Sequence, residues 1–150
     1  MLNRIYISST EVASRKPFIY FIAILKPVAL LYVGQTCQRY GVLGRFFQHL
    51  EPDGTLRNRA IEAGIDDFEN ISIIAVDLSK YNKFGNAYNR YRDALEFLLH
   101  CEMKAKGCKS KIPFEVISNV RANIFVNDFE LQKLSKEIAN EIVDELPYNK

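Results

Sequence analysis

An apolar run from Phe18 to Val33 constrains the fold of this chain more than any other feature, and only Lys26-Pro27 interrupts it. The run is shorter than the about 20 residues that a membrane-spanning helix needs, and a central lysine is costly in a bilayer. Proline also lacks the backbone N–H that a helix interior uses. We therefore expect two buried strands, residues 18–25 and 30–34, joined by a turn into an antiparallel hairpin.

The patterns after the hairpin predict helices around one small sheet. Helical spacing and helix-ending glycines mark three expected helices, at residues 42–50, 56–63 and 88–106. The segment 71–78 is almost continuously apolar, so we expect it to be a central strand. A further short strand is considered at 114–117.

The last helix is the best marked in the sequence. Asn127 is expected to be its N-cap, and Glu130 completes a pair that resembles a capping box. The apolar side chains that follow recur at helical spacing: Leu131, Leu134, Ile138 and Ile142. We expect an α+β fold, with a small antiparallel or mixed sheet of about three strands flanked by helices. A chain of 150 residues has the size of one domain. Its core is expected at about 17–105, with the added C-terminal helix (127–146) packed on it.

Composition is typical of a globular protein in a reducing compartment. Hydrophobic residues make up 48% and charged residues 25% of the chain, which excludes a disordered tail. The three cysteines, Cys37, Cys101 and Cys108, are odd in number and include no C-x-x-C pair. We therefore expect neither a disulfide framework nor a cysteine-rich zinc site, and no signal peptide. A cytoplasmic location follows as the expectation.

Polar and aromatic residues that suit catalysis or phosphate binding occur in the hairpin and in the helix after it. Tyr20 and Tyr32 lie at related places on the two expected strands, although tyrosine also suits strands for structural reasons. Arg45 and His49 are four residues apart and so share one face of the expected helix. A guanidinium suits a phosphate, and an imidazole can pass a proton near neutral pH. The structural alternative is a solvated helix face.

A third cluster is Arg92, Glu96 and His100, spaced by four residues in the expected helix 88–106. The structural alternative is a surface ion pair between Arg92 and Glu96, worth a few tenths of a kcal/mol. The functional alternative is one carboxylate offered to Mg²⁺, which usually takes one or two carboxylates plus waters and phosphate oxygens. Zinc is disfavoured because the chain has two histidines and no cysteine cluster.

Taken in order, these motifs resemble the GIY-YIG nuclease family. The resemblance runs from Phe18-Ile19-Tyr20 through the string LYVGQT (31–36) and the string GRFFQH (44–49) to Ala94-Leu95-Glu96, and spans about residues 17–105. The second tyrosine motif followed by a helix with Arg and then His is its most specific part. The family usually has Gly where this chain has Phe18.

The resemblance implies a DNA endonuclease that uses one divalent metal, Mg²⁺, for which Mn²⁺ can substitute. Tyr20 would then act as general base or as its partner, and Tyr32 would position the water or the phosphate. Arg45 would stabilise the charge on the phosphate, His49 would orient the tyrosine or relay the proton, and Glu96 would bind the metal. Supporting residues would be Gly34 and a late asparagine, either Asn119 or Asn123.

The net charge of +2 hides an uneven distribution that leaves a DNA-facing surface open. Residues 1–60 hold 8 basic and 3 acidic residues, and residues 101–126 hold 5 and 2. Expected DNA contacts, besides Arg45, are Arg39, Lys104, Lys106, Lys109 and Lys111. The partner would be double-stranded or branched DNA, with no membrane. Two alternatives stay open: a weak or inactive GIY-YIG-like nucleic-acid-binding module, suggested by Phe18, and an interaction protein that forms a homodimer through its last helix.

Overall fold

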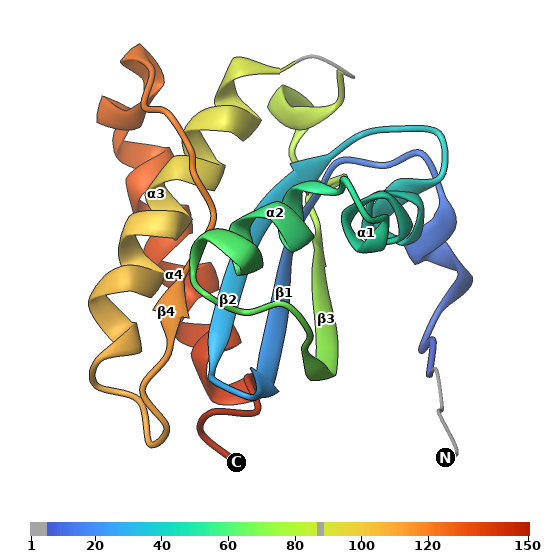
Figure 1. Cartoon of the computed structure of the whole chain (residues 1–150). Coiled ribbons are helices and arrows are strands. Elements are labelled where there is room, and N and C mark those ends of the chain that lie inside the picture. The colour runs from blue at the N-terminus through green and yellow to red at the C-terminus, as the bar shows by residue number, and fades with distance from the viewer. Residues whose placement is uncertain (1–5, 87–88) are drawn as a thin grey trace.

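The computed structural model describes residues 6–86 and 89–150. Within these ranges it has an α+β fold, in which four α-helices flank one four-stranded mixed sheet (Figure 1). The strand order is β3-β1-β2-β4. The predicted fold class is thus correct, and the fourth strand falls within the short strand considered at 114–117.

The apolar run forms the hairpin at the centre of the sheet. Strand β1 (Phe18–Lys26) pairs antiparallel with β2 (Leu30–Thr36), with Phe18 opposite Thr36 and Ile24 opposite Leu30. The break at Lys26-Pro27 is where the chain reverses, as predicted. In the described part of the chain, no helix combines the length and the apolar character that crossing a membrane requires.

Strand β3 (Glu69–Asp77) is an edge strand, so the expectation that it is central was wrong. It pairs with β1, while the short β4 (Glu115–Val116) pairs parallel with β2 on the other side. The apolar run of β3 misled because its side chains alternate between two half-covered faces and are mostly half-buried. Strand β1 has a neighbour on each edge, and its first seven residues are buried.

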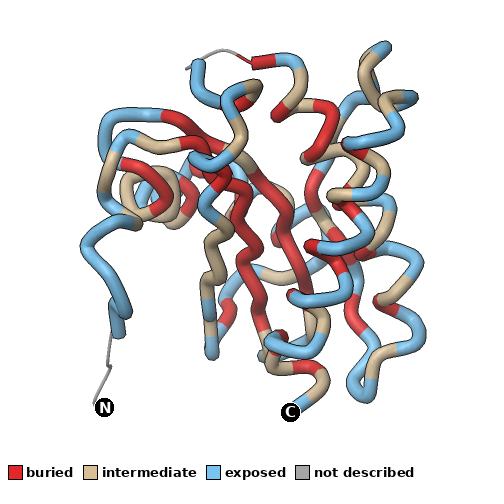
Figure 2. Tube along the Cα trace, turned by 180° about the vertical axis from the view of Figure 1, so that it is seen from behind, coloured by how far each residue is buried: buried red, intermediate tan, exposed pale blue. Residues whose placement is uncertain are grey.

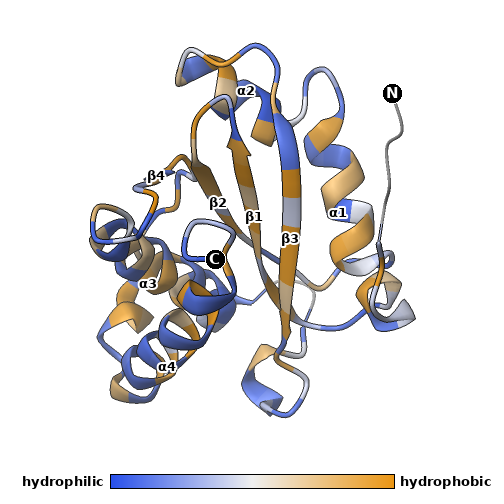
Figure 3. Cartoon of the chain, turned by 90° about the horizontal axis from the view of Figure 1, so that it is seen from below, coloured by the Kyte–Doolittle hydropathy of each residue, from blue (hydrophilic) through white to orange (hydrophobic). Residues whose placement is uncertain are grey.

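Two helices cover each face of the sheet (Figure 3). Helices α1 (Gly41–Leu50) and α2 (Thr55–Glu62) pack on the face that carries Tyr20 and Ile22. Helices α3 (Arg90–Gly107) and α4 (Phe129–Glu145) pack on the face that carries Ile19 and Phe21. The buried stretches concentrate on the central strands and on the inward sides of the helices (Figure 2).

The helix ends refine the sequence predictions. Helix α3 begins at Arg90, because the Asn89 side chain accepts a hydrogen bond from the Arg92 backbone N–H at 2.9 Å; the expected start at residue 88 lies outside the described residues. The N-cap of α4 is Asp128 rather than Asn127, because Asp128 Oδ1 accepts from the Leu131 N–H at 3.0 Å. Residue 127 instead ends a 3-10 helix, η3 (Ile124–Asn127).

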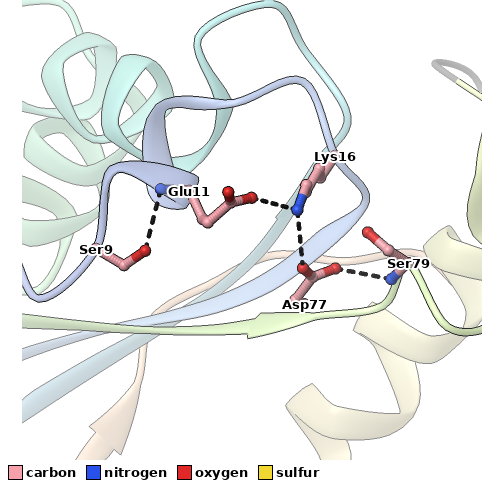
Figure 4. A network of polar contacts seen from close by, with 5 residues as sticks. All are labelled: Ser9, Glu11, Lys16, Asp77 and Ser79. Atoms are coloured by element: carbon pink, nitrogen blue, oxygen red, sulfur yellow. Dashed lines mark hydrogen bonds and ion pairs between the residues drawn. The ribbon is translucent and has the colours of Figure 1, made fainter.

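Polar contacts tie the segment around Lys16 and the C-terminal Tyr148 to the sheet. The Tyr148 hydroxyl donates to the carbonyls of Ile24 and Leu30, at the closed end of the hairpin. Near the other terminus, Lys16 contacts both Glu11 and Asp77, and Asp77 accepts from the Ser79 N–H at 2.8 Å (Figure 4). This exposed network joins the segment around η1 (Thr10–Ala13) to the end of β3.

Candidate active site

Tyr20 and Tyr32 lie on neighbouring strands and belong to the same buried cluster, beneath α1 and α2. Tyr20 is the third residue of β1, and Tyr32 lies on β2, where it is paired with Ile22. Tyr20 is 1% exposed and Tyr32 9%. The sheet register thus makes the two tyrosines diagonal neighbours.

Gly34 makes room for the Tyr20 ring. The two residues are cross-strand partners, and a Cβ on Gly34 would lie 2.3 Å from Tyr20 Cζ and 2.4 Å from its hydroxyl oxygen. No side chain fits at that distance, so the ring lies flat across β2 only because residue 34 is glycine. The supporting role expected for Gly34 therefore has a steric basis.

His49 of α1 contacts both tyrosines. It comes from the inner face of α1, is 1% exposed, and its Nε2 lies 2.7 Å from the Tyr20 hydroxyl oxygen. Its ring also meets the Tyr32 ring edge-on, with 4.7 Å between the centroids. Burial, aided by the positive charge of Arg45, lowers the pKa of His49 to about 4. The imidazole is therefore neutral near pH 7.

Burial also raises the pKa of the two tyrosine hydroxyls. It raises the pKa of Tyr20 well above its ordinary range and that of Tyr32 to about 12. The Arg45 charge acts in the opposite direction on both hydroxyls, as a phenolate-stabilising residue should, but burial outweighs it. Both tyrosines are therefore protonated in the absence of a ligand, and neither is a ready-made base.

Arg45 lies on α1, one turn before His49. It is half-buried, and its guanidinium donates to Gln48 Oε1 at 2.7 Å. Its positive charge lowers the pKa of Tyr20, Tyr32, His49 and Glu96. The spacing of Arg45 and His49 places them on one side of α1, as the sequence predicted.

Glu96 approaches the same place from α3. Burial, followed by repulsion from Asp93, raises its pKa to about 8. Its negative charge in turn raises the pKa of both tyrosines. It lines a depression of about 360 Å³ together with Arg90, Asp93 and the segment 119–123.

The short length of β4 explains how α3 reaches the tyrosines. The pairing of β4 with β2 covers only Leu30 and Leu31, and farther along β2 the contacts come from α3. There Gln35 donates to Asp93 Oδ1 at 3.0 Å and accepts from Arg92 Nε. The first turns of α3, and Glu96 with them, are thereby held against the end of β2.

Arg92 and His100 do not have the roles that their spacing with Glu96 suggested. A surface ion pair of Arg92 with Glu96 was the wrong expectation, because Arg92 is 1% exposed. Its guanidinium donates to the carbonyls of Phe84 at 2.8 Å and Asn86 at 2.6 Å, besides Gln35. His100 Nδ1 lies 2.8 Å from Ser118 Oγ. Both residues therefore hold neighbouring segments in place.

The structure separates the two candidate asparagines by their hydrogen bonds. Both line the depression beside Glu96. Asn123 Nδ2 donates to the Arg90 carbonyl at 2.9 Å, and its Oδ1 accepts from the Phe125 N–H at 2.9 Å. Asn119 is exposed and has no hydrogen-bond partner among the described residues. Asn123 thus shapes the site, and Asn119 is the amide that can face a ligand.

The five expected catalytic residues come together, but the expected lysines lie elsewhere. Lys104 is about 12 Å beyond Glu96 along the axis of α3, at a rise of about 1.5 Å per residue. Lys106 Nζ contacts Asn140 Oδ1 of α4 at 2.8 Å, and the backbone N–H of Lys111 donates to Asn149. Lys109 follows Lys106 at the same end. Exposed Arg39 stacks on Tyr40 at the start of α1. DNA contact by these residues stays a prediction.

Several residues beside the site were missed in the sequence. Arg59 of α2 acts on Tyr32, while its guanidinium pairs with Glu62 at 2.7 Å. Asp93, Arg90 and Arg121 line the Glu96 depression. The spacing of Asp93 and Glu96 on adjacent turns of one helix was the only available signal. Nothing in the local sequence indicated that Arg59 acts on Tyr32 or that Arg121 lies beside Glu96.

The donor set beside Glu96 fits a single hard cation such as Mg²⁺. The depression offers the carboxylates of Glu96 and Asp93 and the amide of Asn119, and Mg²⁺ usually takes one or two carboxylates with waters and phosphate oxygens. A cation would also stabilise the ionised form of Glu96, whose pKa is raised by burial and then by the Asp93 charge. Across residues 6–86 and 89–150, no group of three His, Cys, Asp or Glu side chains gathers as a closed site would require.

Comparison of the chain with models of known protein families, with curated proteins and with solved structures finds no match. The resemblance to the GIY-YIG family therefore stays a prediction that rests on the motifs.

Proposed function

We propose that this chain is a divalent-metal-dependent DNA endonuclease of the GIY-YIG type, with Tyr20, Tyr32, Arg45, His49 and Glu96 as its catalytic residues. The observation that carries the proposal is the contact of Tyr20 with the buried, neutral His49 at 2.7 Å, within the fields of Arg45 and Glu96. A proton acceptor, a permanent cation and a carboxylate at one point match the needs of phosphodiester hydrolysis.

In this proposal, His49 and Tyr20 act as one base. With its own proton on Nδ1, His49 accepts the Tyr20 proton at Nε2, while the Tyr20 oxygen accepts a proton from water. The water oxygen forms the new bond to phosphorus, and the bond from phosphorus to the leaving sugar oxygen breaks. His49 later returns its proton to solvent or to that leaving oxygen, which closes the proton balance.

The remaining residues would stabilise the negative charge on the phosphate and position the reacting groups. Arg45 would bind the phosphoryl oxygens, where negative charge grows in the transition state. Tyr32, packed edge-on against His49, would hold the imidazole ring in place and orient the water. A divalent cation held by Glu96, with Asp93 and Asn119 nearby, would supply polarisation of the phosphate and stabilisation of the leaving oxygen.

One observation favours the alternative, a GIY-YIG-like module that binds nucleic acid without efficient cleavage. Burial keeps a proton on both tyrosines and leaves His49 a weak base, with a pKa of about 4. Phe18, in contrast, gives this alternative little support. It is 3% exposed and packs in the same cluster as Tyr20, and β1 keeps its pairing on both sides.

A cleavage assay on a panel of DNA structures decides between the two. Wild type, Glu96→Gln and Arg45→Ala would be purified identically and mixed with plasmid, linear duplex, branched and single-stranded DNA, in Mg²⁺, Mn²⁺ or a chelator. Metal-dependent cleavage that both variants lose supports the endonuclease. Salt-sensitive binding without cleavage supports the alternative. Cleavage that persists in Glu96→Gln contradicts the proposed mechanism.

A further inference from the structure

The depression beside Glu96 is flanked by two arginines that no motif had singled out. Arg90 is the first residue of α3, and Arg121 lies in the segment 118–123, between β4 and η3. Both line the depression with Asp93 and Glu96. The fold thus brings together two positive side chains that are far apart in the sequence.

The segment that carries Arg121 is attached to α3 at both of its ends. Ser118 Oγ lies 2.8 Å from His100 Nδ1, and Asn123 Nδ2 donates to the Arg90 carbonyl at 2.9 Å. These two contacts set the position of the segment relative to Glu96. The backbone around Arg121 is therefore ordered before any ligand arrives, which reduces the entropic cost of binding.

Arg90 is also held in place. Its guanidinium lies over the Phe125 ring, 5.5 Å from the centroid, and that ring packs against Tyr91 at 4.3 Å. Cation–π contact of this kind restrains an arginine without using its hydrogen-bond donors. All of the N–H groups of the fork stay available for an oxygen ligand.

The charges of the depression define the ligand that would fit. The Asp93 carboxylate would repel a phosphate, while Arg90 and Arg121, which line the same depression, attract one. An arginine fork binds phosphate oxygens in a bidentate manner. The positive charges that act on Glu96 itself are those of Arg45 and Arg92, while Arg90 and Arg121 line the depression beside it.

We propose that Arg90 and Arg121 form a clamp for a backbone phosphate of DNA next to the phosphate that is cut. This inference rests on the proposed function and deepens it, because it assigns the path of the substrate strand. One phosphate meets Arg45 and Tyr20, and its neighbour along the strand meets the clamp. The clamp binds the backbone and reads no bases, so it contributes affinity without sequence preference.

Binding measured in a chelator tests the clamp without relying on activity. A labelled duplex of about 20 base pairs would be titrated with wild type, Arg90→Ala, Arg121→Ala and the double variant, between about 50 and 200 mM salt. Each single variant should weaken affinity about tenfold at the lower salt concentration. Each should also reduce the slope of log K against log salt by about one.

The matched control removes a positive charge outside the depression. Lys136 is exposed on α4, and Lys136→Ala should bind within about twofold of wild type. Arg90→Lys and Arg121→Lys keep the charge and lose the fork, so they should recover only part of the affinity. Thermal unfolding of each variant verifies that the fold is intact.

Two results would overturn the clamp and leave the proposed function standing. One is wild-type affinity and salt slope in the double variant, alongside cleavage that depends on Glu96. The other is a loss of cleavage at saturating DNA with no change in affinity, which would make the arginines part of the catalytic step. Cleavage that is independent of Glu96 would contradict the proposed function instead, whatever the arginines do.

Discussion

The two faces of the sheet bury different kinds of side chain. On the face beneath α3 and α4, the buried polar groups are partnered by backbone: the Tyr148 hydroxyl contacts backbone carbonyls of the hairpin, and the 1% exposed Arg92 of α3 donates to the carbonyls of Phe84 and Asn86. On the face beneath α1 and α2, the buried cluster holds Tyr20 and Tyr32, and the buried imidazole of His49 packs against both.

This difference implies that one face contributes mainly to stability and that the other carries the candidate catalytic groups. Burying polar or titratable groups costs free energy unless they are well partnered. The α3 and α4 face offsets this cost with backbone carbonyl partners for Arg92 and Tyr148. The α1 and α2 face instead buries Tyr20 against His49, a contact that serves as a proton path in the proposed function. Substitutions on the two faces should therefore give opposite patterns of activity and stability.

The largest expected effect comes from Glu96, the carboxylate that α3 extends toward the α1 and α2 face. Glu96→Gln keeps the shape of the side chain and removes its charge. Cleavage should fall at least about a thousandfold, or about 4 kcal/mol of transition-state stabilisation. The measurement is single-turnover cleavage at saturating DNA, with circular dichroism to verify folding. Retention of even a tenth of the wild-type rate would remove Glu96 from the mechanism.

Two buried tyrosines offer a direct comparison between the faces. Tyr20 is 1% and Tyr148 0% exposed, and the two hydroxyls have different partners. Tyr20→Phe should lower the cleavage rate about a hundredfold, because the proton path to His49 is cut. Tyr148→Phe should lower the free energy of unfolding by about 1–3 kcal/mol, since two buried carbonyls lose a donor. Its cleavage rate per folded molecule should not change.

Denaturant unfolding and single-turnover cleavage on the same samples separate the two outcomes. The comparison between the faces would be wrong if Tyr148→Phe lost catalysis while fully folded, or if Tyr20→Phe cleaved at the wild-type rate.

His49 predicts a pH dependence of stability that belongs to the α1 and α2 face. Its pKa is about 4 in the folded chain against about 6.5 when unfolded. The unfolded state therefore binds more protons between these values, so stability is complete above about pH 6.5 and is lost as pH falls toward 4. The loss should approach roughly 3 kcal/mol.

The test subtracts the unfolding free energies of His49→Gln from those of wild type at each pH. The carboxylates contribute equally to the pH dependence of both proteins, so the difference isolates the contribution of the His49 imidazole. A difference that stays constant from pH 7 to pH 4 would show that His49 is not buried in its neutral form.

A pair of glycines gives the smallest expected effects. Alanine at Gly34 would place its Cβ 2.3 Å from the Tyr20 ring, and alanine at Gly107 would place it 2.5 Å from the Phe114 carbonyl oxygen. Both variants should lose about 1–3 kcal/mol of stability through overpacking. Only Gly34→Ala should also lose cleavage, because Tyr20 must move. Equal cleavage by the two folded variants would argue against the placement of Tyr20.

The parts of the fold that local patterns control could be read in advance. The Lys26-Pro27 break predicted the hairpin, and helix-ending glycines and helical spacing predicted α1, α2, α3 and α4 to within a few residues. The central position of β3 was predicted wrongly, because an apolar run does not reveal how many neighbours a strand has. The N-cap of α4 moved by one residue, because two adjacent residues, Asn127 and Asp128, have side chains that can cap.

The candidate site, like the fold, was only partly predictable from the sequence. The sequence alone indicated five candidate residues, because they stand in ordered motifs, and it showed that Arg45 and His49 share a helix face: the five are Tyr20, Tyr32, Arg45, His49 and Glu96. Only the tertiary structure decided that the Tyr20 ring crosses Gly34, that Asn123 is a structural tether, and that Arg90 and Arg121 meet beside Glu96. The physical reason is that charge and burial depend on neighbours in space. The two arginines come from separate segments that hydrogen bonds to α3 bring together, whereas the lysines predicted to bind DNA lie at the other end of the same helix.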